Sequence, residues 1–338
     1  MTGNSVIPIW VDCDPGHDDA VAILLGCFHP SIRLLGISAS YGNASPENTL
    51  YNTLSLLTAF GKQDEVPVYK GAQRPWVRDV AYAPDIHGET GLDGTTLLPK
   101  PKRSFVDADY IKAMENAILE NGGNIALVST GTLTSIATLF REKPYLKEHV
   151  RYISIMGGGL HAGNRNDNDS AEFNIWADPD AADFIFNDED IKHKCILSPL
   201  DLTHTCIATE YIDKTILGNG SCKLRKLFYE LFLFFAKTYK NKQGFEAGPP
   251  VHDPVTLMPL LYLYGHISND ILRFKYGRFD LSIDKNQDSI NYGRTIVTQE
   301  YPSDSKVGLM VGLQINVDFF WNQVLNAIDV AEDYPGSL

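Results

Sequence analysis

The sequence contains no Cys-x-x-Cys pair, and its cysteines are odd in number. The five are Cys13, Cys27, Cys195, Cys206 and Cys222. This pattern argues against a disulfide framework and against a zinc site, and it is typical of a protein in a reducing compartment.

Targeting and membrane-spanning segments are missing from the sequence as well. Residues 1–5 hold no basic segment and Asp12 interrupts the first apolar run, so we expect no signal peptide. No apolar run approaches the length that a bilayer requires. We therefore predict a cytoplasmic protein, with the nucleus as a second location to consider, and no membrane partner.

Positive charge is scarce. Lys and Arg number 29 against 42 Asp and Glu, which gives a net charge of −13 at pH 7, and no basic stripe runs along the chain. Because nucleic acids and anionic membrane surfaces are held largely by Lys and Arg, we expect neither as a partner.

Flexible Gly/Ser linkers, composition breaks, internal repeats and low-complexity tracts are also lacking. The 338 residues are 44% hydrophobic and 21% charged, which suffices for one sizeable core. Short apolar runs alternate with helical segments, a pattern typical of an α/β fold with a mostly parallel central sheet flanked by helices. We therefore predict a single domain over residues 1–338.

The sequence does have a dense cluster of acid after its first predicted strand. Residues 7–11 are strand-like, residues 20–25 predict a buried helix, and four aspartates lie between them: Asp12, Asp14, Asp18 and Asp19. In a doubly wound sheet such a loop opens into the ligand crevice. Carboxylates this close disfavour one another's ionisation unless a cation binds or some take up protons. Ca²⁺ or Mg²⁺ is the simplest answer, and a solvated helix-capping loop is the alternative.

Later junctions add polar residues that would reach the same crevice. They are Asn43 after residues 34–40, Thr130 after 125–128, Asn164, Glu172 and Asn174 after 152–156, and His252-Asp253 before a helix over 255–264. Singly, each has a plainer explanation as turn chemistry, a mobile loop or helix capping. Together they favour a binding site.

A long loop over residues 71–104 carries four prolines, aromatic residues and His87. Loops of this length inside a compact protein are either functional or disordered. The aromatic residues favour a lid over the site, although a lone loop histidine is also often structural or exposed.

The block from Asp12 to Ala20, Asp-Cys-Asp-Pro-Gly-His-Asp-Asp-Ala, resembles the amino-terminal fingerprint of the inosine-uridine-preferring nucleoside hydrolases. His252-Asp253-Pro254 resembles their later signature. The similarity extends along essentially the whole chain and is greatest to the fungal uridine ribohydrolases. It implies that family's fold, with the site at the carboxyl ends of the strands. It also implies Ca²⁺-dependent hydrolysis of the N-glycosidic bond of a ribonucleoside, uridine first, and a homodimer or homotetramer.

The same resemblance implies a role for each candidate residue. Asp14, Asp19, the backbone carbonyl of Thr130 and Asp253 would bind Ca²⁺, with Asp14 as general base on a metal-bound water. Asp18 and Asn43 would hold the 2′-hydroxyl side of the ribose, and Asn164, Glu172 and Asn174 its 5′ and 3′ hydroxyls. His252 and His87 would meet the leaving base. The spacing from Asn164 to Glu172 is longer than the family pattern, so the register between them is open.

Tyr239 and Gln243 are candidates for the base pocket, one turn apart after an apolar helical stripe. Both side chains could hydrogen-bond a pyrimidine carbonyl, which favours uridine, or they could lie on the surface. The alternatives are a broad, purine or nicotinamide riboside hydrolase, a haloacid-dehalogenase-type phosphatase, and a nucleoside-binding protein without catalysis. The phosphatase would require a later acidic pair that the sequence does not offer convincingly.

Overall fold

The computed structural model describes residues 6–338, so the expectation for residues 1–5 lies outside the described residues. Nine strands form one sheet in the order β3-β2-β1-β4-β5-β6-β9-β7-β8. The strands are β1 (Ile7–Cys13), β2 (Ile32–Ala39), β3 (Val68–Lys70), β4 (Ile125–Ser129), β5 (Val150–Met156), β6 (Cys195–Ser198), β7 (Lys275–Ile283), β8 (Thr295–Tyr301) and β9 (Leu309–Gln314). Strands β1 to β6 and β9 are parallel to one another, and β7 runs antiparallel to β9 and β8. The predicted, mostly parallel α/β sheet is confirmed.

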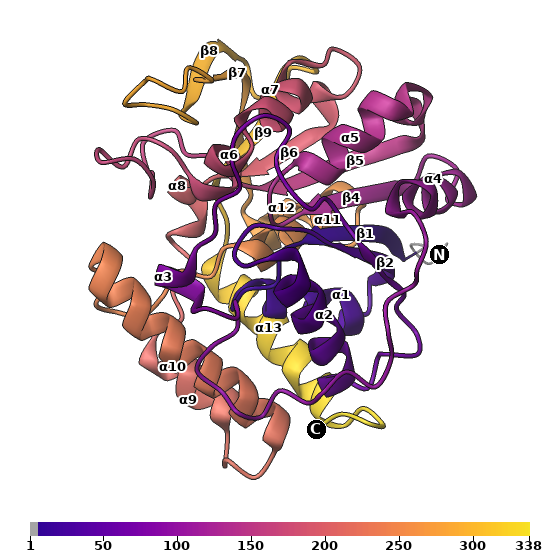
Figure 1. The fold of residues 1–338 in the computed structure, drawn as a ribbon, viewed down its shortest axis with the longest axis vertical. Coiled ribbons are helices and arrows are strands. Elements are labelled where there is room, and N and C mark those ends of the chain that lie inside the picture. The colour runs from indigo at the N-terminus through magenta and orange to yellow at the C-terminus, as the bar shows by residue number, and fades with distance from the viewer. Residues whose placement is uncertain (1–5) are drawn as a thin grey trace.

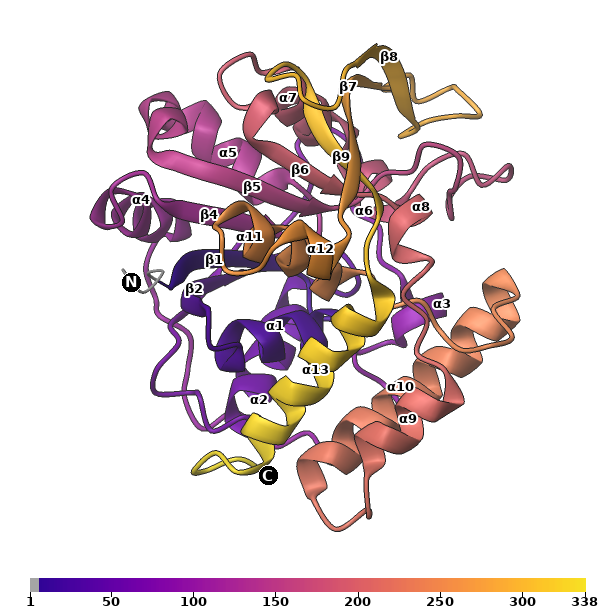
Figure 2. The ribbon, with the colours of Figure 1, turned by 180° about the vertical axis from the view of Figure 1, so that it is seen from behind.

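Helices cover both faces of this sheet (Figures 1 and 2). They are α1 (Asp19–Phe28), α2 (Pro46–Ala59), α3 (Pro84–His87), α4 (Tyr110–Glu120), α5 (Thr134–Glu142), α6 (Phe173–Ala177), α7 (Pro179–Asn187), α8 (Leu200–Thr203), α9 (Glu210–Leu217), α10 (Lys223–Gln243), α11 (Leu257–Leu263), α12 (Asn269–Leu272) and α13 (Val317–Glu332), with 3-10 helices at Pro144–His149, Lys192–Lys194 and Asp253–Thr256. Among the described residues, no helix is both long and apolar enough to cross a membrane.

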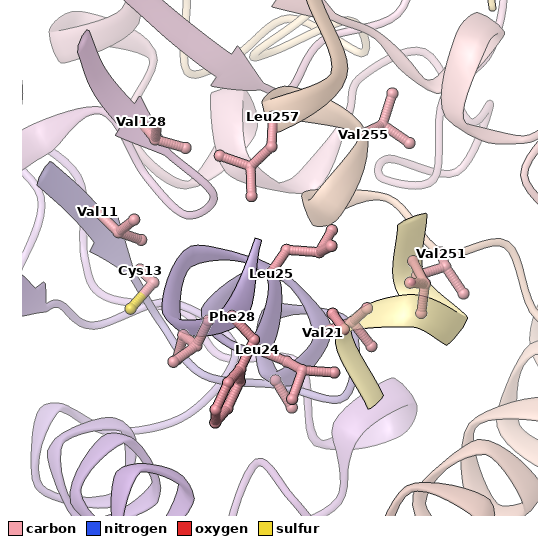
Figure 3. Packing of buried hydrophobic residues seen from close by; sticks show 14 of the residues in the cluster. Val11, Cys13, Val21, Leu24, Leu25, Phe28, Val128, Val251, Val255 and Leu257 are labelled. Carbon is pink, nitrogen blue, oxygen red and sulfur yellow. The ribbon is translucent and has the colours of Figure 1, made fainter. Parts of the chain in front are cut away.

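Alternate side chains of β1 fill two separate cores. Ile9 and Val11 pack with α1, α2, α11 and α13 on one face, and Trp10 packs with α4, α5 and α7 on the other. Figure 3 shows part of the first core, where Val11 and Val128 face α1 and the segment that carries Leu257. Each large apolar side chain buried in this way contributes roughly 1.5–3 kcal/mol. The packing fixes the start of α1, and the acidic loop leads directly into that start.

Side-chain caps mark the starts of two of these helices. Ser45 caps α2 by accepting a hydrogen bond from the backbone N of Asn48 at 3.3 Å, and Pro46 is the first helical residue. Asp178 caps α7 in the same way, accepting from the backbone N of Ala181 at 3.1 Å.

Other elements were not predicted. Strand β8 lies at the sheet edge, and its central residues are exposed on both sides, so it lacks the alternating apolar pattern that marks a half-buried strand. The loop over residues 71–104 contains the short helix α3, which packs beside α10 (Figure 1). The closing helix α13 runs from Val317 to Glu332.

Candidate active site

A cavity with an empty volume of about 430 Å³ opens where the carboxyl ends of β1, β2, β4 and β5 meet α3 and the end of α10. The predicted residues that line it are Asp18, Asn43, His87, Thr130, Asn164, Glu172, Asn174, Tyr239, Gln243, His252 and Asp253. Asp14 and Asp19 are fully buried next to this lining. The strand ends bring Asp18, Asn43 and Thr130 into one place, as the parallel-sheet rule requires. His87 comes from α3, Tyr239 and Gln243 come from α10, and His252-Asp253 comes from the segment after α10.

Three buried carboxyl groups meet at one end of the cavity. Oxygen atoms of Asp18, Asp19 and Asp253 lie within 4.8 Å of one another. Burial, followed by the charges of Asp18 and Asp19, raises the pKa of Asp253 well above its usual range. Burial and the charge of Asp19 raise the pKa of Asp18 to about 7. Carboxyl groups this close repel one another when ionised unless a cation binds or some of them take up protons.

Asp14 adjoins these three residues. Its Oδ2 accepts a hydrogen bond from the backbone N of Asn43 at 2.7 Å, and its Oδ1 is buried without a hydrogen-bond partner. A Cβ atom on Gly42 or Gly131 would collide with the Asp14 carboxyl group, so both glycines are needed for its placement. Burial, followed by the charge of Asp19, raises the pKa of Asp14 well above its usual range.

These oxygen atoms suit a hard divalent cation. Ca²⁺ prefers several carboxylate and carbonyl oxygens, and a buried carboxylate oxygen without a partner is an available ligand. The predicted ligand set was Asp14, Asp19, Thr130 and Asp253. The structure gathers Asp19 and Asp253 with Asp18 as the third acid, and Asp14, whose buried Oδ1 has no hydrogen-bond partner, lies outside that group of three. The donor set therefore fits Ca²⁺.

Asp19 ties three strand-end loops together. Its Oδ1 accepts a hydrogen bond from Thr130 Oγ1 at 2.7 Å. Its Oδ2 accepts from the backbone N of Gly16 at 2.9 Å and from Asn43 Nδ2 at 3.1 Å. The loops after β1, β2 and β4 are thus held in one arrangement by a single carboxyl group.

Asp12, the first acid of the cluster, does not join the site. Its side chain accepts hydrogen bonds from Ser38 Oγ and, at 3.0 Å, from Ser40 Oγ, both from β2 or the residue after it. Burial raises its pKa to about 7. We therefore assign Asp12 to the fold, where it links β1 with the end of β2.

On the opposite wall, Glu172 fixes the loop after β5. Its carboxyl group accepts from the backbone N of Gly158 at 2.8 Å, of Asn174 at 2.8 Å and of Ile175 at 3.1 Å, so it also caps α6. Asn174 Nδ2 donates to the backbone carbonyl of Thr130 at 2.9 Å. Asn164 Oδ1 is buried without a hydrogen-bond partner, and it is therefore free to meet a ligand.

A chain of polar groups borders the cavity next to the acidic group. Tyr239 Oη lies 2.8 Å from His252 Nε2, and Thr203 Oγ1 lies 2.7 Å from His252 Nδ1. The backbone N of His252 donates to Asp18 Oδ2 at 3.1 Å, which joins this chain to the acidic group. Burial lowers the pKa of His252 well below its usual range, so its ring is neutral at pH 7. Tyr239 is buried, which contradicts a place on the surface.

Two lining or neighbouring residues were missed by the sequence analysis. His17 lies inside the quoted block and contacts His87, and burial lowers its pKa to about 4. Arg165 lines the cavity, packs on the ring of Phe173 and lies 3.9 Å from Asp85 of α3. His17 could have been found from the sequence, because its aromatic ring lies within a run of acids. Arg165 could not, because it lies in the polar loop between Asn164 and Glu172, whose alignment with the family pattern was open.

Comparison with known proteins agrees with this geometry. Residues 9–322 match the family model described as inosine-uridine preferring nucleoside hydrolase. The chain belongs to this family of enzymes, so it is a nucleoside hydrolase by class. The family resemblance inferred from the acidic block is confirmed, and the phosphatase alternative is set aside.

The chain is also similar to individual nucleoside hydrolases. The chain is 59% identical to the uridine nucleosidase of Saccharomyces cerevisiae over 97% of each chain. It is 37% identical to the pyrimidine-specific ribonucleoside hydrolase RihA of Escherichia coli O7:K1, over 75% of this chain and 79% of that one. The solved structure of a purine-preferring ribonucleoside hydrolase from Gardnerella vaginalis superposes with a TM-score of 0.83, at 25% identity, over 97% of this chain and 100% of that one. The predicted fold is therefore confirmed.

Proposed function

We propose that this chain hydrolyses the N-glycosidic bond of uridine to release uracil and ribose, with Ca²⁺ as cofactor and Asp14 as general base. The observation that carries the proposal is one cavity lined both by carboxyl groups of the acidic cluster and by the Tyr239–His252 pair. The choice of uridine rests on the similarity to the yeast uridine nucleosidase and to the pyrimidine-specific enzyme of E. coli.

The acidic end of the cavity suits the sugar. Breaking the N-glycosidic bond develops positive charge on the ribose ring, and preorganised carboxylates stabilise that charge. Asp18 and Asn43 both line the cavity beside the acidic group and can hold the 2′-hydroxyl side of the ribose. Asn164, Glu172 and Asn174 on the opposite wall can hold the 5′ and 3′ hydroxyls. Hydroxyl contacts on two sides fix the orientation of the anomeric carbon.

Asp14 is the best-placed general base. The hydrogen bond from the Asn43 backbone fixes its Oδ2, which leaves Oδ1 free to take a proton from water. Bound Ca²⁺ would keep the clustered carboxylates ionised and lower the pKa of a coordinated water. Asp19, Asp253 and the Thr130 carbonyl are the other groups that would hold the ion.

The Tyr239–His252 pair suits the leaving base. When Thr203 donates to His252 Nδ1, the neutral ring carries its proton on Nε2 and donates to Tyr239 Oη, which frees the phenol proton for the base. Protonation of the base prevents a full negative charge from developing on it. Gln243, which also lines the cavity, can hydrogen-bond a pyrimidine carbonyl.

Replacing Tyr239 by phenylalanine tests this role. We expect kcat for uridine to fall about 100-fold, because one positioned proton donor is lost. A riboside with a nitrophenolate leaving group, which departs without a proton, should react at nearly the wild-type rate. Tyr229→Phe, on the same helix and partly exposed, is the matched control. Equal losses on both substrates would reassign Tyr239 to folding or sugar binding.

The substrate proposal is tested with a nucleoside panel. Ribose release from uridine, cytidine, inosine and nicotinamide riboside should be measured by reducing-sugar assay, with and without chelator. We expect the highest kcat/KM for uridine and loss of release under chelation. A higher kcat/KM for inosine would assign a purine preference, and stoichiometric binding without ribose release would assign a nucleoside-binding protein.

Two further expectations accompany the proposal. We propose a homodimer or homotetramer, which sedimentation analysis would measure, and a cytoplasmic location, which microscopy of a tagged chain would measure. Both rest on the family resemblance and on the composition of the sequence.

A further inference from the structure

His17 is held between aromatic rings beneath the lid helix α3. Its ring centroid lies 5.2 Å from that of Phe234 and 5.1 Å from that of Phe235, and each pair of ring planes is within 5° of parallel. The His87 ring stacks at 5.4 Å. The side chain is buried at 2% exposure, so the orientation of its two nitrogen atoms is fixed.

The hydrogen bond to Asp93 determines where the His17 ring carries its proton. His17 Nε2 lies 2.8 Å from the backbone carbonyl oxygen of Asp93. A carbonyl oxygen only accepts, so Nε2 carries the hydrogen. The ring is neutral, and its Nδ1 therefore presents a lone pair.

This lone pair faces His87. His17 Nδ1 and His87 Nδ1 are 3.2 Å apart, so His87 Nδ1 must carry a hydrogen and donate it. A competing contact exists, because the backbone N–H of His17 lies 3.3 Å from the same His87 atom. If His87 Nδ1 accepted that longer bond, two lone pairs would face each other at 3.2 Å. The two contacts favour opposite tautomers of His87, and we assign the shorter one, between the two rings, as the hydrogen bond.

The backbone carbonyl of Asp93, which accepts the hydrogen bond from His17, is itself held in place. The Asp93 carboxyl group accepts from the backbone N of Glu89 at 3.0 Å and of Thr90 at 3.3 Å, which closes the turn after α3. Asn52 of α2 donates to the Thr90 carbonyl at 2.8 Å and to the Pro15 carbonyl at 3.1 Å. The turn is thus tied to the acidic loop and cannot move independently of His17.

Gly16 allows the two histidines to meet. A Cβ atom at this position would collide with the His87 ring and lie 2.8 Å from Asn43 Nδ2. The close approach of the lid to the acidic loop therefore depends on a residue without a side chain.

We propose that His17 is a positioning residue that fixes the orientation and the tautomer of His87, so that neutral His87 presents a hydrogen-bond-accepting Nε2 to the cavity. Since Nδ1 faces His17, Nε2 is the atom left for the cavity that His87 lines. His87 then accepts an N–H or O–H of the substrate, and the proton for the leaving base comes from the Tyr239–His252 side. This inference rests on the proposed function, in which His87 meets the nucleoside.

Two His17 variants separate hydrogen bonding from packing. His17→Phe keeps the aromatic stack and removes both ring nitrogens, whereas His17→Gln keeps one donor and one acceptor and removes the ring. In ¹⁵N-histidine spectra of the substrate-free protein, assigned with His87→Phe, we expect a protonated Nδ1 on His87 in wild type and in His17→Gln. In His17→Phe we expect a shift toward the Nε2-protonated form.

Kinetics then show whether His17 acts through His87. We expect His17→Phe to lower kcat for uridine about 10-fold with KM changed less, and His17→Gln to restore most of the loss. In a His87→Phe background, His17→Phe should cause no further loss, because the contact is already gone. Thermal denaturation of each variant reports folding, and if His17→Phe does not fold, His17→Gln, alone and combined with His87→Phe, carries the test.

Several outcomes would overturn the proposal. The first is an unchanged His87 tautomer in His17→Phe. The second is a loss of kcat from His17→Phe that is equally large in the His87→Phe background. The third is a His17→Gln protein that folds but does not keep the Nδ1-protonated form of His87. A wild-type protein that releases no ribose from any nucleoside would instead remove the proposed function. The spectra need no turnover, so they test His17 separately.

Discussion

Replacing Asp14 by asparagine should lower kcat for uridine by about 1,000-fold or more and leave KM within a few-fold of wild type. Loss of a general base alone reduces turnover by about 100- to 10,000-fold. The KM should change little because Asp14 is buried next to the lining, whereas Asp18 and Asn43 face the cavity. The side-chain amide has the shape of the carboxyl group, so the close packing against Gly42 and Gly131 is retained.

The control for Asp14→Asn is Asp107→Asn, the same chemical change at an exposed position. It should leave kcat, KM and the melting temperature unchanged. Steady-state kinetics and the calcium content of the purified variant should be measured together. If excess Ca²⁺ restores turnover in Asp14→Asn, Asp14 serves in ion binding rather than as the base. A kcat within about 10-fold of wild type would end both assignments.

The positions of the site residues along the chain could be predicted because one rule governs them. Parallel strands place the residues that follow their carboxyl ends at one edge, so Asn43 and Thr130 meet the acids after β1 although they are far apart in sequence. Asp253 follows no strand and comes from the segment between α10 and α11. Apolar runs marked most of those strands. The same reasoning could not find the edge strand β8, because its exposed residues do not alternate between apolar and polar.

The finer arrangement of the site depends on side-chain orientation, which sequence patterns do not contain. Asp14, Asp18 and Asp19 lie within a few residues, and the local turn into α1 decides that Asp18 joins Asp19 and Asp253. The partner of His252, Thr203, comes from α8, and the partner of His17 comes from the lid. Such contacts form only when separate segments pack together. The sequence therefore predicted which residues meet, but not which atoms bond.

Removal of divalent ions should abolish ribose release and make the stability of the protein fall as pH rises. In the ion-free protein burial and neighbouring acids raise the pKa values of Asp14, Asp18 and Asp253, so folding favours their protonated forms. Stability is then greatest below the unfolded pKa of about 4 and is lost as pH rises, for Asp18 through about 7. Each extra proton held by the native state makes the fall of the free energy of unfolding with pH steeper by about 1.4 kcal/mol per pH unit.

Calcium should reverse this dependence. The bound ion provides ionised carboxylates with an opposite charge, so the loaded protein should lose stability at low pH, where protons compete for the same oxygens. Melting temperatures between pH 5 and 8, with Ca²⁺ and with chelator, should therefore diverge as pH rises. A difference between the two melting temperatures that stays constant or narrows as pH rises, or a chelated protein that still releases ribose, would contradict an ion site among these acids.

Asp253→Asn gives the sharpest version of this test, because its two effects have opposite signs. The variant removes one buried charge from the group that Asp18 and Asp19 complete, so the chelated variant should melt above the chelated wild type at pH 8. It also removes a ligand, so Ca²⁺ should raise its melting temperature less and its turnover should be low. An exposed acid such as Asp107 would show neither effect when changed to asparagine. Only mutual repulsion relieved by a shared cation predicts a substitution that stabilises the empty protein and weakens the loaded one.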